Sequence, residues 1–369
     1  MTKRPKHILI SGGGTGGHIF PAVAIADGLK ERLTDAEILF VGAKGRMEMK
    51  RVPEAGYPIE GLWISGIQRS LSTKNLAFPF KLISSLFRAR QIVKRFKPDL
   101  AIGVGGYASG PLLWAATRAG VPSLIQEQNS YPGITNRVLA NKVQCICVAF
   151  EGMEKWFPAG RTILTGNPLR PKAIDIAGKR EEALAYFGLE SDKPVVLITG
   201  GSQGARSINN AILAGLDMLT GLGIQLIWQC GEAFYTFARE AITKRNYSNL
   251  HLTPFISRMD LAYAAADLVV ARAGAMTVAE LAATAKPAIL VPLPTAAEDH
   301  QTSNARKLEE AGAAILQPNN TAKEQLVSAI ITLANDAERR KTMSLNVSRF
   351  ARIDATQRIV DEALKLMKA

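Results

Sequence analysis

Short apolar runs alternate with longer segments of mixed polarity along the whole chain. A run of roughly four to eight apolar residues bounded by turn residues is typical of a strand buried on both faces of a parallel sheet. The segments between the runs have helical spacing, the first from about His18 to Leu33. The first half holds the runs HILIS, EILFVG, DLAIGVGG, PSLIQEQ and VQCICVAF, and the second half holds PVVLITGG, IQLIWQC, NLHLTPF, DLVVAR, PAILVP and AAILQP. This alternation predicts an α/β protein with two Rossmann-like, doubly wound domains.

A break between the two series lies at TGNPLRP, where Pro168 and Pro171 stand close together. We therefore expect a first domain over residues 1–168 and a second over 169–351, with a charged helix over Ile174–Glu190 after the break. A polar helix over about 352–369 ends the chain and is able to pack on either domain; we expect it to return to the first. Because ligands of open parallel sheets bind beyond the carboxyl ends of the strands, the active site is expected in a cleft where the two domains face each other.

The first glycine-rich segment, Gly12–His18, follows an apolar run and opens a helix. It is either a tight turn or a cradle for an anion, because a helix N-terminus presents free N–H groups to negative charge. The segment also satisfies G-x-G-x-x-G, which raises the possibility of a nicotinamide cofactor. That fingerprint needs an acid at the end of the second strand, where this chain has Val41-Gly42-Ala43-Lys44. A dehydrogenase is therefore disfavoured, and we expect no cofactor.

Three further segments of this kind follow apolar runs: Gly105–Pro111, Gly200–Ala205 and Ala273–Glu280. The segment Gly200–Ala205 has the same arrangement as the first, with Ser202 as an added hydroxyl donor. Glu280 falls in the first or second turn of its helix. Its carboxylate either complements the helix dipole or accepts the two hydroxyls of a ribose, and the spacing alone does not decide between these roles.

Charge is distributed unevenly along the chain. The net charge is +13, and residues 1–169 hold 22 Lys and Arg against 11 Asp and Glu. The first half therefore faces an anionic partner, either nucleic acid or an acidic membrane surface. No RNA-binding motif or recognition helix is evident, so we expect no nucleic acid. The three cysteines are too few for a disulfide framework and complete no metal site.

A basic and apolar stretch favours the membrane. Between Gly61 and Pro98 there are eight basic residues and no acid. Apolar side chains bordered by Lys and Arg suit interfacial binding to anionic lipid, although the same helix has a side that packs on the sheet, at Ile92, Val93 and Phe96. No segment reaches the roughly 18 apolar residues of a membrane-spanning helix. The expected patch consists of Leu76, Phe80, Lys81, Ile83, Leu86 and Arg88.

The segments GGTGGHIFPAVAIA, GGYASGP, EQNSYPGITN, GNPLR, GGSQGARSIN and ARAGAMTVAEL occur in this order over roughly residues 6–312. Together they resemble the MurG family of bacterial glycosyltransferases (glycosyltransferase family 28). The resemblance implies the GT-B architecture and inverting transfer from UDP-N-acetylglucosamine to the 4-hydroxyl of the N-acetylmuramyl residue of lipid I, undecaprenyl-pyrophosphoryl-N-acetylmuramyl-pentapeptide, which gives lipid II for peptidoglycan. It also implies peripheral attachment to the cytoplasmic face of the inner membrane and contacts with cell-wall and division proteins.

The resemblance also implies roles for individual residues. On the donor side, Asn129 contacts the N-acetylglucosamine, Ile256 presents backbone groups to uracil, Glu280 holds the ribose and Gln301 binds sugar hydroxyls. The remaining donor residues lie near the diphosphate: Thr15, Gly16, Gly17, Arg170, Ser202, Ala275, Met276, Thr277, Val278 and Ala279. The acceptor side comprises Gly105, Gly106, Tyr107 and Ser109. Several relatives have Gln-Gln where this chain has His300-Gln301, so His300 either replaces an amide or faces solvent.

Direct displacement needs a base for the acceptor hydroxyl and positive potential for the departing diphosphate. His18 is the candidate base, because an imidazole titrates near neutral pH; its alternatives are a structural hydrogen bond or a contact with the acceptor diphosphate. The chain has no Asp-x-Asp motif, so the sequence requires no metal.

Two classes of function remain as alternatives. One is another enzyme of the same fold, such as a UDP-N-acetylglucosamine 2-epimerase or a transferase with a soluble acceptor. The other is a non-catalytic nucleotide-binding protein.

Overall fold

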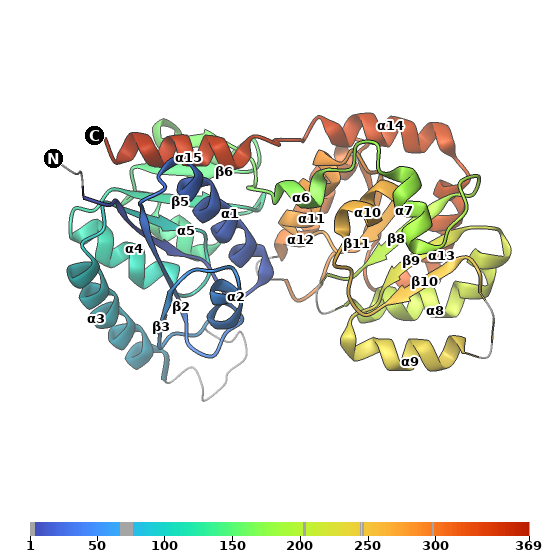
Figure 1. Ribbon diagram of the computed structural model, residues 1–369, viewed down its shortest axis with the longest axis horizontal. Coiled ribbons are helices and arrows are strands. Elements are labelled where there is room, and N and C mark those ends of the chain that lie inside the picture. Colours follow the sequence, from blue (N-terminus) through green and yellow to red (C-terminus); the bar gives the residue numbers. More distant parts are fainter. Residues whose placement is uncertain are drawn as a thin grey trace. The chain divides into compact units, whose positions relative to one another are not determined.

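The computed structural model describes residues 4–66, 77–201, 204–243, 245, 247–296 and 299–368. The chain folds into two compact units (Figure 1). Unit 1 comprises Met1–Leu169 together with Ile353–Ala369, and unit 2 comprises Arg170–Arg352. Each unit is a parallel sheet with helices on its faces, as the alternation of apolar runs predicted.

Unit 1 has a seven-stranded sheet in the order β3-β2-β1-β4-β5-β6-β7, and every paired strand in it is parallel. The strands are β1 His7–Ser11, β2 Glu37–Ala43, β3 Ile59–Leu62, β4 Leu100–Gly103, β5 Ser123–Glu127, β6 Cys145–Val148 and β7 Thr162–Leu164. The five inner strands coincide with the five apolar runs. The two edge strands, β3 and β7, carry no such run, and most of their residues stay partly accessible.

The helices of unit 1 cover both faces of this sheet (Figure 1). They are α1 Gly16–Arg32, α2 Glu48–Glu54, α3 Phe78–Phe96, α4 Ser109–Arg118, α5 Ile134–Leu139 and the C-terminal α15 Ala355–Leu366. Helix α15 returns to unit 1 and packs against α1. The close approach depends on Gly28, because a Cβ there would lie 2.9 Å from Cγ2 of Thr356.

Unit 2 has a six-stranded parallel sheet in the order β10-β9-β8-β11-β12-β13. Its strands are β8 Val195–Thr199, β9 Gln225–Gln229, β10 Leu250–Thr253, β11 Leu268–Ala271, β12 Ala288–Leu290 and β13 Ala314–Leu316, and each lies in a predicted apolar run. Its helices are α6 Pro171–Ile174, α7 Arg180–Phe187, α8 Arg206–Gly221, α9 Glu232–Ile242, α10 Met259–Ala265, α11 Ala275–Ala283, α12 His300–Glu310, α13 Ala322–Ala334 and α14 Ala337–Ser348.

The single helix expected over Ile174–Glu190 was wrong. Helix α6 ends at Ile174, residues 175–179 are not helical, and only α7 lies within the expected span; Gly178 between the two helices has a φ of 71°. A positive φ suits glycine and does not continue a right-handed helix.

The strand order of each sheet reverses at one point, between β1 and β4 in unit 1 and between β8 and β11 in unit 2. In open α/β sheets, ligands bind beyond the carboxyl ends of the strands at this switch point. The four glycine-containing segments follow these four strands. The topology therefore brings them together as two pairs, one pair in each unit.

Candidate functional site

The two glycine segments of unit 1 touch each other at the switch point. A Cβ on Gly106 would overlap the carbonyl of Gly13, and a Cβ on Gly105 would lie 2.9 Å from Nε2 and Cδ2 of His18. Gly105 and Gly106 also have φ values of 93° and 89°, which favour glycine. These glycines are therefore needed both for backbone conformation and for the close contact between the segments.

The imidazole of His18 is held by the loop that precedes it. His18 lies in the first turn of α1, is partly buried, and has Nδ1 2.9 Å from the carbonyl oxygen of Gly13. A carbonyl only accepts, so this contact assigns the proton to Nδ1 and leaves the lone pair of the neutral ring on Nε2. Thr15 and Gly17 beside it are exposed, and Gly16 is partly buried at the start of α1.

Glu48 is a component of this site that the sequence did not reveal. Its side chain is 1% exposed, and its two oxygens accept the N–H groups of Gly14 (2.9 Å) and Ala43 (3.0 Å). The end of β2 itself has no acid, as the sequence indicated; Glu48 comes five residues after Ala43, and its carboxylate binds protein backbone. No local pattern marks it, because its partner Gly14 lies 34 residues away in the chain.

The second glycine segment presents one exposed and one buried candidate. Tyr107 is 46% exposed, and its ring lies so close to Gly66 that a Cβ there would overlap it. Ser109 begins α4 with its side chain fully buried, and its hydroxyl has no hydrogen-bond partner among the described residues. Tyr107 is therefore accessible to a ligand, whereas Ser109 lies beneath the segment.

Asn129 is oriented by Glu127, which ends β5. The buried carboxylate of Glu127 accepts the backbone N–H (3.0 Å) and side-chain amide (3.3 Å) of Asn129, the N–H of Gly133 and the amide of Asn136. Burial raises the pKa of Glu127, and these hydrogen bonds oppose the rise. Asn129 stays partly accessible at the carboxyl end of the sheet, next to the switch point.

In unit 2, the segment after β8 turns sharply before α8. Gly201 and Gly204 have φ values of 76° and 74°, and a Cβ on Gly204 would overlap the carbonyl oxygen of Cys230. The N–H of Gly201 binds the hydroxyl of Thr199 at 3.2 Å. Ser202 lies outside the described residues, so its predicted place by a phosphate stays a prediction.

The segment after β11 opens α11 at Ala275, so Glu280 lies in the second turn. Tyr263 on α10, 1% exposed, donates its hydroxyl to Oε2 of Glu280 at 2.9 Å. Burial raises the pKa of Glu280, while the Tyr263 hydroxyl and the charge of Arg170 oppose that rise. Arg170, at the start of α6, is exposed. The structure thus brings Arg170 and Glu280 into electrostatic range and adds Tyr263, which the sequence did not single out.

The other candidate donor residues on α11 differ in exposure. Ala275 and Val278 are buried, and Met276, Thr277 and Ala279 are partly accessible.

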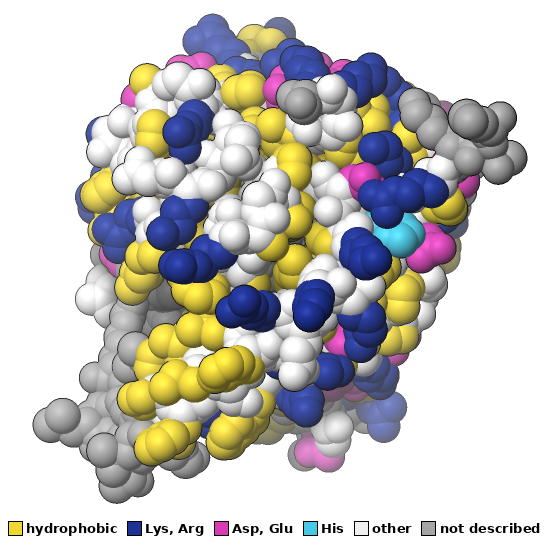
Figure 2. Space-filling model, turned by 90° about the vertical axis from the view of Figure 1, so that its left-hand side faces the viewer, with side chains coloured by type: hydrophobic (Ala, Val, Ile, Leu, Met, Phe, Trp, Pro, Cys, Tyr) yellow, Lys and Arg dark blue, Asp and Glu magenta, His cyan; other side chains and the backbone are white. Residues whose placement is uncertain are grey.

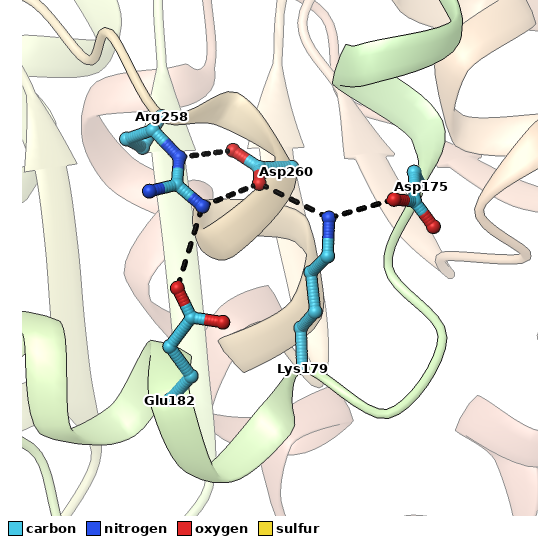
Figure 3. A network of polar contacts seen from close by, with 5 residues as sticks. All are labelled: Asp175, Lys179, Glu182, Arg258 and Asp260. Carbon is cyan, nitrogen blue, oxygen red and sulfur yellow. Dashed lines mark hydrogen bonds and ion pairs between the residues drawn. The ribbon is translucent and has the colours of Figure 1, made fainter.

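A network of ion pairs anchors the segment that carries Ile256 (Figure 3). Arg258 binds both oxygens of Asp260, at 2.9 and 2.8 Å, and Lys179 lies between Asp260 and Asp175. The hydrogen bonds from Arg258 hold the pKa of Asp260 at about 2. Ile256 itself is 5% exposed, so only its backbone is suited to contact a ligand.

Gln301 lies in the first turn of α12, and its Oε1 accepts the N–H of Leu293 at 2.9 Å. Its amide nitrogen is therefore the group suited to bind a ligand oxygen. Asn304 donates to the carbonyl of Ala273 at 3.2 Å and connects α12 to the segment before α11. His300 begins α12 and is partly buried.

Helix α3 presents an exposed stripe at helical spacing. Phe80, Ile83 and Phe87 are 71%, 53% and 66% exposed, and Arg90 and Lys94 continue the same face. Figure 2 shows this side of unit 1, with Lys and Arg spread across it and hydrophobic side chains gathered at its lower left.

Other members of the expected patch lie differently. Leu86 is partly buried, Lys81 donates to Ser65 at 3.0 Å, and Arg88 pairs with Glu60 at 3.0 Å. Leu76 lies outside the described residues. Phe87, which was not predicted, is more exposed than Leu86.

No three His, Cys, Asp or Glu side chains in residues 4–66, 77–201, 204–243, 245, 247–296 and 299–368 gather as metal ligands do. Over the same residues, no helix combines the length and the apolar character that crossing a bilayer requires.

Comparison with known proteins relates these two sites to a family. Residues 8–148 match the glycosyltransferase family 28 N-terminal domain, and residues 195–359 match the glycosyltransferase family 28 C-terminal domain. A relative from Cytophaga hutchinsonii, 52% identical over 99% of this chain and 98% of its own, is named UDP-N-acetylglucosamine–N-acetylmuramyl-(pentapeptide) pyrophosphoryl-undecaprenol N-acetylglucosamine transferase.

Solved structures agree with this match. The crystal structure of MurG from Acinetobacter baumannii is similar with a TM-score of 0.79 and 31% identity, covering 98% of this chain and all of that one. A UDP-N-acetylglucosamine 2-epimerase, at 15% identity and a TM-score of 0.64 over 98% of this chain and 96% of that one, shares the fold alone. This chain therefore belongs to glycosyltransferase family 28 and is a glycosyltransferase of the GT-B fold, in the group of N-acetylglucosamine transferases that these relatives represent.

Proposed function

We propose that the protein transfers N-acetylglucosamine from UDP-N-acetylglucosamine to the 4-hydroxyl of the N-acetylmuramyl residue of lipid I, giving lipid II and UDP. The observation that carries the proposal is the pairing of the family's glycine segments at the switch points of two sheets, together with the whole-chain similarity to transferases named for this reaction. Unit 2 takes the UDP moiety, and the more basic unit 1 takes the lipid-linked acceptor.

Donor binding uses the carboxyl ends of β8 and β11. The backbone of Ile256 contacts uracil, Glu280 accepts the ribose hydroxyls, and the amide nitrogen of Gln301 donates to the sugar. The diphosphate lies at the N-terminus of α11, where free N–H groups and the helix dipole favour negative charge. Arg170 and Ser202 add to this positive potential, which stabilises the UDP that leaves.

The transfer is a direct displacement at the anomeric carbon. The acceptor 4-hydroxyl oxygen forms the new bond while the bond to the β-phosphate oxygen breaks, and its electron pair leaves with UDP. The hydroxyl proton passes to Nε2 of His18, the nitrogen that carries the lone pair when Nδ1 donates to Gly13. The transferred N-acetylglucosamine contacts Asn129. The donor's sugar and diphosphate are lined by Thr15, Gly16 and Gly17. The acceptor lies along Gly105, Gly106 and Tyr107.

The assay that tests this proposal measures UDP release from UDP-N-acetylglucosamine with and without a short-chain lipid I analogue. Release that depends on the analogue, with a disaccharide product, supports the transferase. Conversion of the donor to UDP-N-acetylmannosamine without acceptor would instead indicate a 2-epimerase. UDP binding without turnover in the presence of the analogue would indicate a non-catalytic nucleotide-binding protein.

The stripe on α3 is the proposed membrane contact, so that the protein binds peripherally to the cytoplasmic face of the inner membrane. Three exposed apolar side chains followed on the same face by Arg90 and Lys94 suit insertion between anionic headgroups. Each cation near such a surface contributes about 1 kcal/mol. Division and cell-wall proteins are further proposed partners, for which the resemblance to the family is the support.

Vesicle flotation tests this contact with charge reversal at Arg90 and Lys94. Lys81 and Arg88 are poorer targets, because they already bind Ser65 and Glu60. We expect the Arg90→Glu/Lys94→Glu protein to lose roughly tenfold or more in binding to anionic vesicles. The control, Lys323→Glu/Lys341→Glu, makes the same charge change at exposed sites of unit 2 and should bind normally. Equal binding by both variants would contradict the assignment of α3.

A further inference from the structure

We infer that Glu48 is a positioning residue that fixes the peptide between Gly13 and Gly14 and, through Gly13, the imidazole of His18. The contacts of Glu48 stand on the geometry alone, and the catalytic consequence rests on the proposed function. Glu48 lies at the start of α2, in the connection after β2, whereas Gly13 and His18 belong to the connection after β1. The carboxylate therefore joins two connections at the same end of the sheet.

The space beneath the loop is filled by the Glu48 side chain. A Cβ on Gly13 would overlap the Glu48 carboxylate, and a Cβ on Gly42 would lie 2.6 Å from Cγ of Glu48. Neither glycine has the positive φ that would otherwise account for it. These two glycines are explained by the room that Glu48 needs, and the conformation of the loop depends on a side chain outside it.

The hydrogen bonds of Glu48 show what holds it in place. One oxygen accepts from Gly14 and the other from Ala43, at 2.9 and 3.0 Å, and the side chain is 1% exposed. Within the described residues, no Lys or Arg forms an ion pair with it. A buried carboxylate without a cation is costly unless it is hydrogen-bonded, so both N–H groups are tightly bound to it.

This arrangement changes the role of the first glycine segment. The N–H of Gly14 already binds a carboxylate, so that group is not available to a phosphate. The N–H groups suited to an anion are those of the residues that follow, at the N-terminus of α1. The part of the segment before Thr15 instead acts as a support, and its carbonyl at Gly13 binds Nδ1 of His18.

The consequence for catalysis is orientational. Gly13 contacts the Glu48 side chain and also accepts from the His18 ring. A shift of this peptide therefore changes the direction of the His18 ring and weakens the preference for the Nδ1–H tautomer. A displacement of about 1 Å in a catalytic group can cost roughly 100-fold in rate. The groups proposed to hold uracil and ribose lie in unit 2 and do not involve this peptide, so the effect should fall mainly on kcat.

Glu48→Gln tests the inference with little change in volume. The amide keeps one acceptor, but its NH2 must face one of the two N–H donors. We expect kcat to fall roughly 10- to 100-fold while KM for the donor changes less than about twofold. The matched control is Glu54→Gln on the same helix, whose exposed carboxylate pairs with Arg51; it should keep normal kinetics. Normal kcat in Glu48→Gln would overturn the inference.

A spectroscopic measurement separates this inference from the proposed reaction. Nitrogen NMR of the four histidines, assigned with His18→Asn, reports the tautomer of His18 directly. We expect the Nδ1–H form in the wild type and a mixture in Glu48→Gln, whatever the substrate is. An unchanged His18 signal in Glu48→Gln overturns the inference. Failure of the wild type to turn over lipid I would refute the proposed function alone.

A pair of variants keeps the test valid if Glu48→Gln does not fold. Gly13→Ala should be strongly destabilised by overlap with the Glu48 carboxylate, and adding Glu48→Ala should restore part of the lost stability by vacating that space. Thermal unfolding of both single variants and the double variant measures this coupling. Additive losses would overturn the inference, because they would show that Gly13 and Glu48 do not share the space.

Discussion

The hydroxyl of Tyr263 donates to a carboxylate that we propose binds the donor's ribose. Tyr263→Phe removes this one hydroxyl and keeps the ring, which is 1% exposed, so the packing of α10 should be preserved. A hydrogen bond to a charged group contributes about 1.5–3 kcal/mol. Without the hydroxyl, Glu280 is held less firmly and its pKa rises further, and both changes weaken ribose binding. We therefore expect the KM for UDP-N-acetylglucosamine to rise roughly tenfold, with kcat nearly unchanged.

The pH dependence gives this prediction a sign. Burial raises the pKa of Glu280, and the Tyr263 hydroxyl lowers it, so the variant should have a still higher pKa. Ribose binding needs the carboxylate form. Donor affinity should therefore fall as the pH falls through the pKa of Glu280, and in Tyr263→Phe the fall should begin at a higher pH.

Calorimetric titration of UDP over a range of pH, with initial rates against donor concentration, provides the measurement. Tyr186→Phe is the control, because Tyr186 is an exposed tyrosine on α7 of the same unit and should behave as the wild type. Unchanged UDP affinity and an unchanged pH profile in Tyr263→Phe would refute the reasoning that this hydroxyl prepares Glu280 for the ribose.

Three further predictions follow from other parts of the molecule. His18→Ala should lower kcat about 10²–10⁴-fold at saturating substrates if His18 is the base, and near-normal turnover would exclude that role. Burial lowers the pKa of Lys286 from 10.5 to about 8. Between these pH values the unfolded chain binds the proton more than the folded protein does, so the free energy of unfolding should rise with pH. Urea unfolding across this range should show the rise in the wild type and its loss in Lys286→Met. Gly28→Ala should destabilise the protein by about 1–3 kcal/mol because its Cβ would meet Thr356 on α15, and thermal unfolding should show partial relief in Gly28→Ala/Thr356→Ser.

The candidate site was predicted unevenly, and the reason differs between residues. The sequence singled out the glycine segments because they follow apolar strands, and with them His18 and Glu280, whereas Asn129 came from the resemblance to the family; the roles of these residues stay predictions. It did not reveal Glu48 or Tyr263. Each of these contacts its partner from another element, and no local pattern marks which acid or which tyrosine that will be.

Apolar periodicity by itself determined the two doubly wound units and eleven of their strands, namely the five inner strands of unit 1 and the six strands of unit 2. A strand covered on both faces must be apolar along its length. The edge strands β3 and β7 and the break between α6 and α7 escaped it, because partial exposure and a glycine of positive φ leave only weak patterns. Only the tertiary structure decided which glycine segments meet, that Glu48 supports the first of them, and that α3 exposes Phe87 and partly buries Leu86. These features depend on contacts between residues far apart in the chain, which strand order and helix packing bring together.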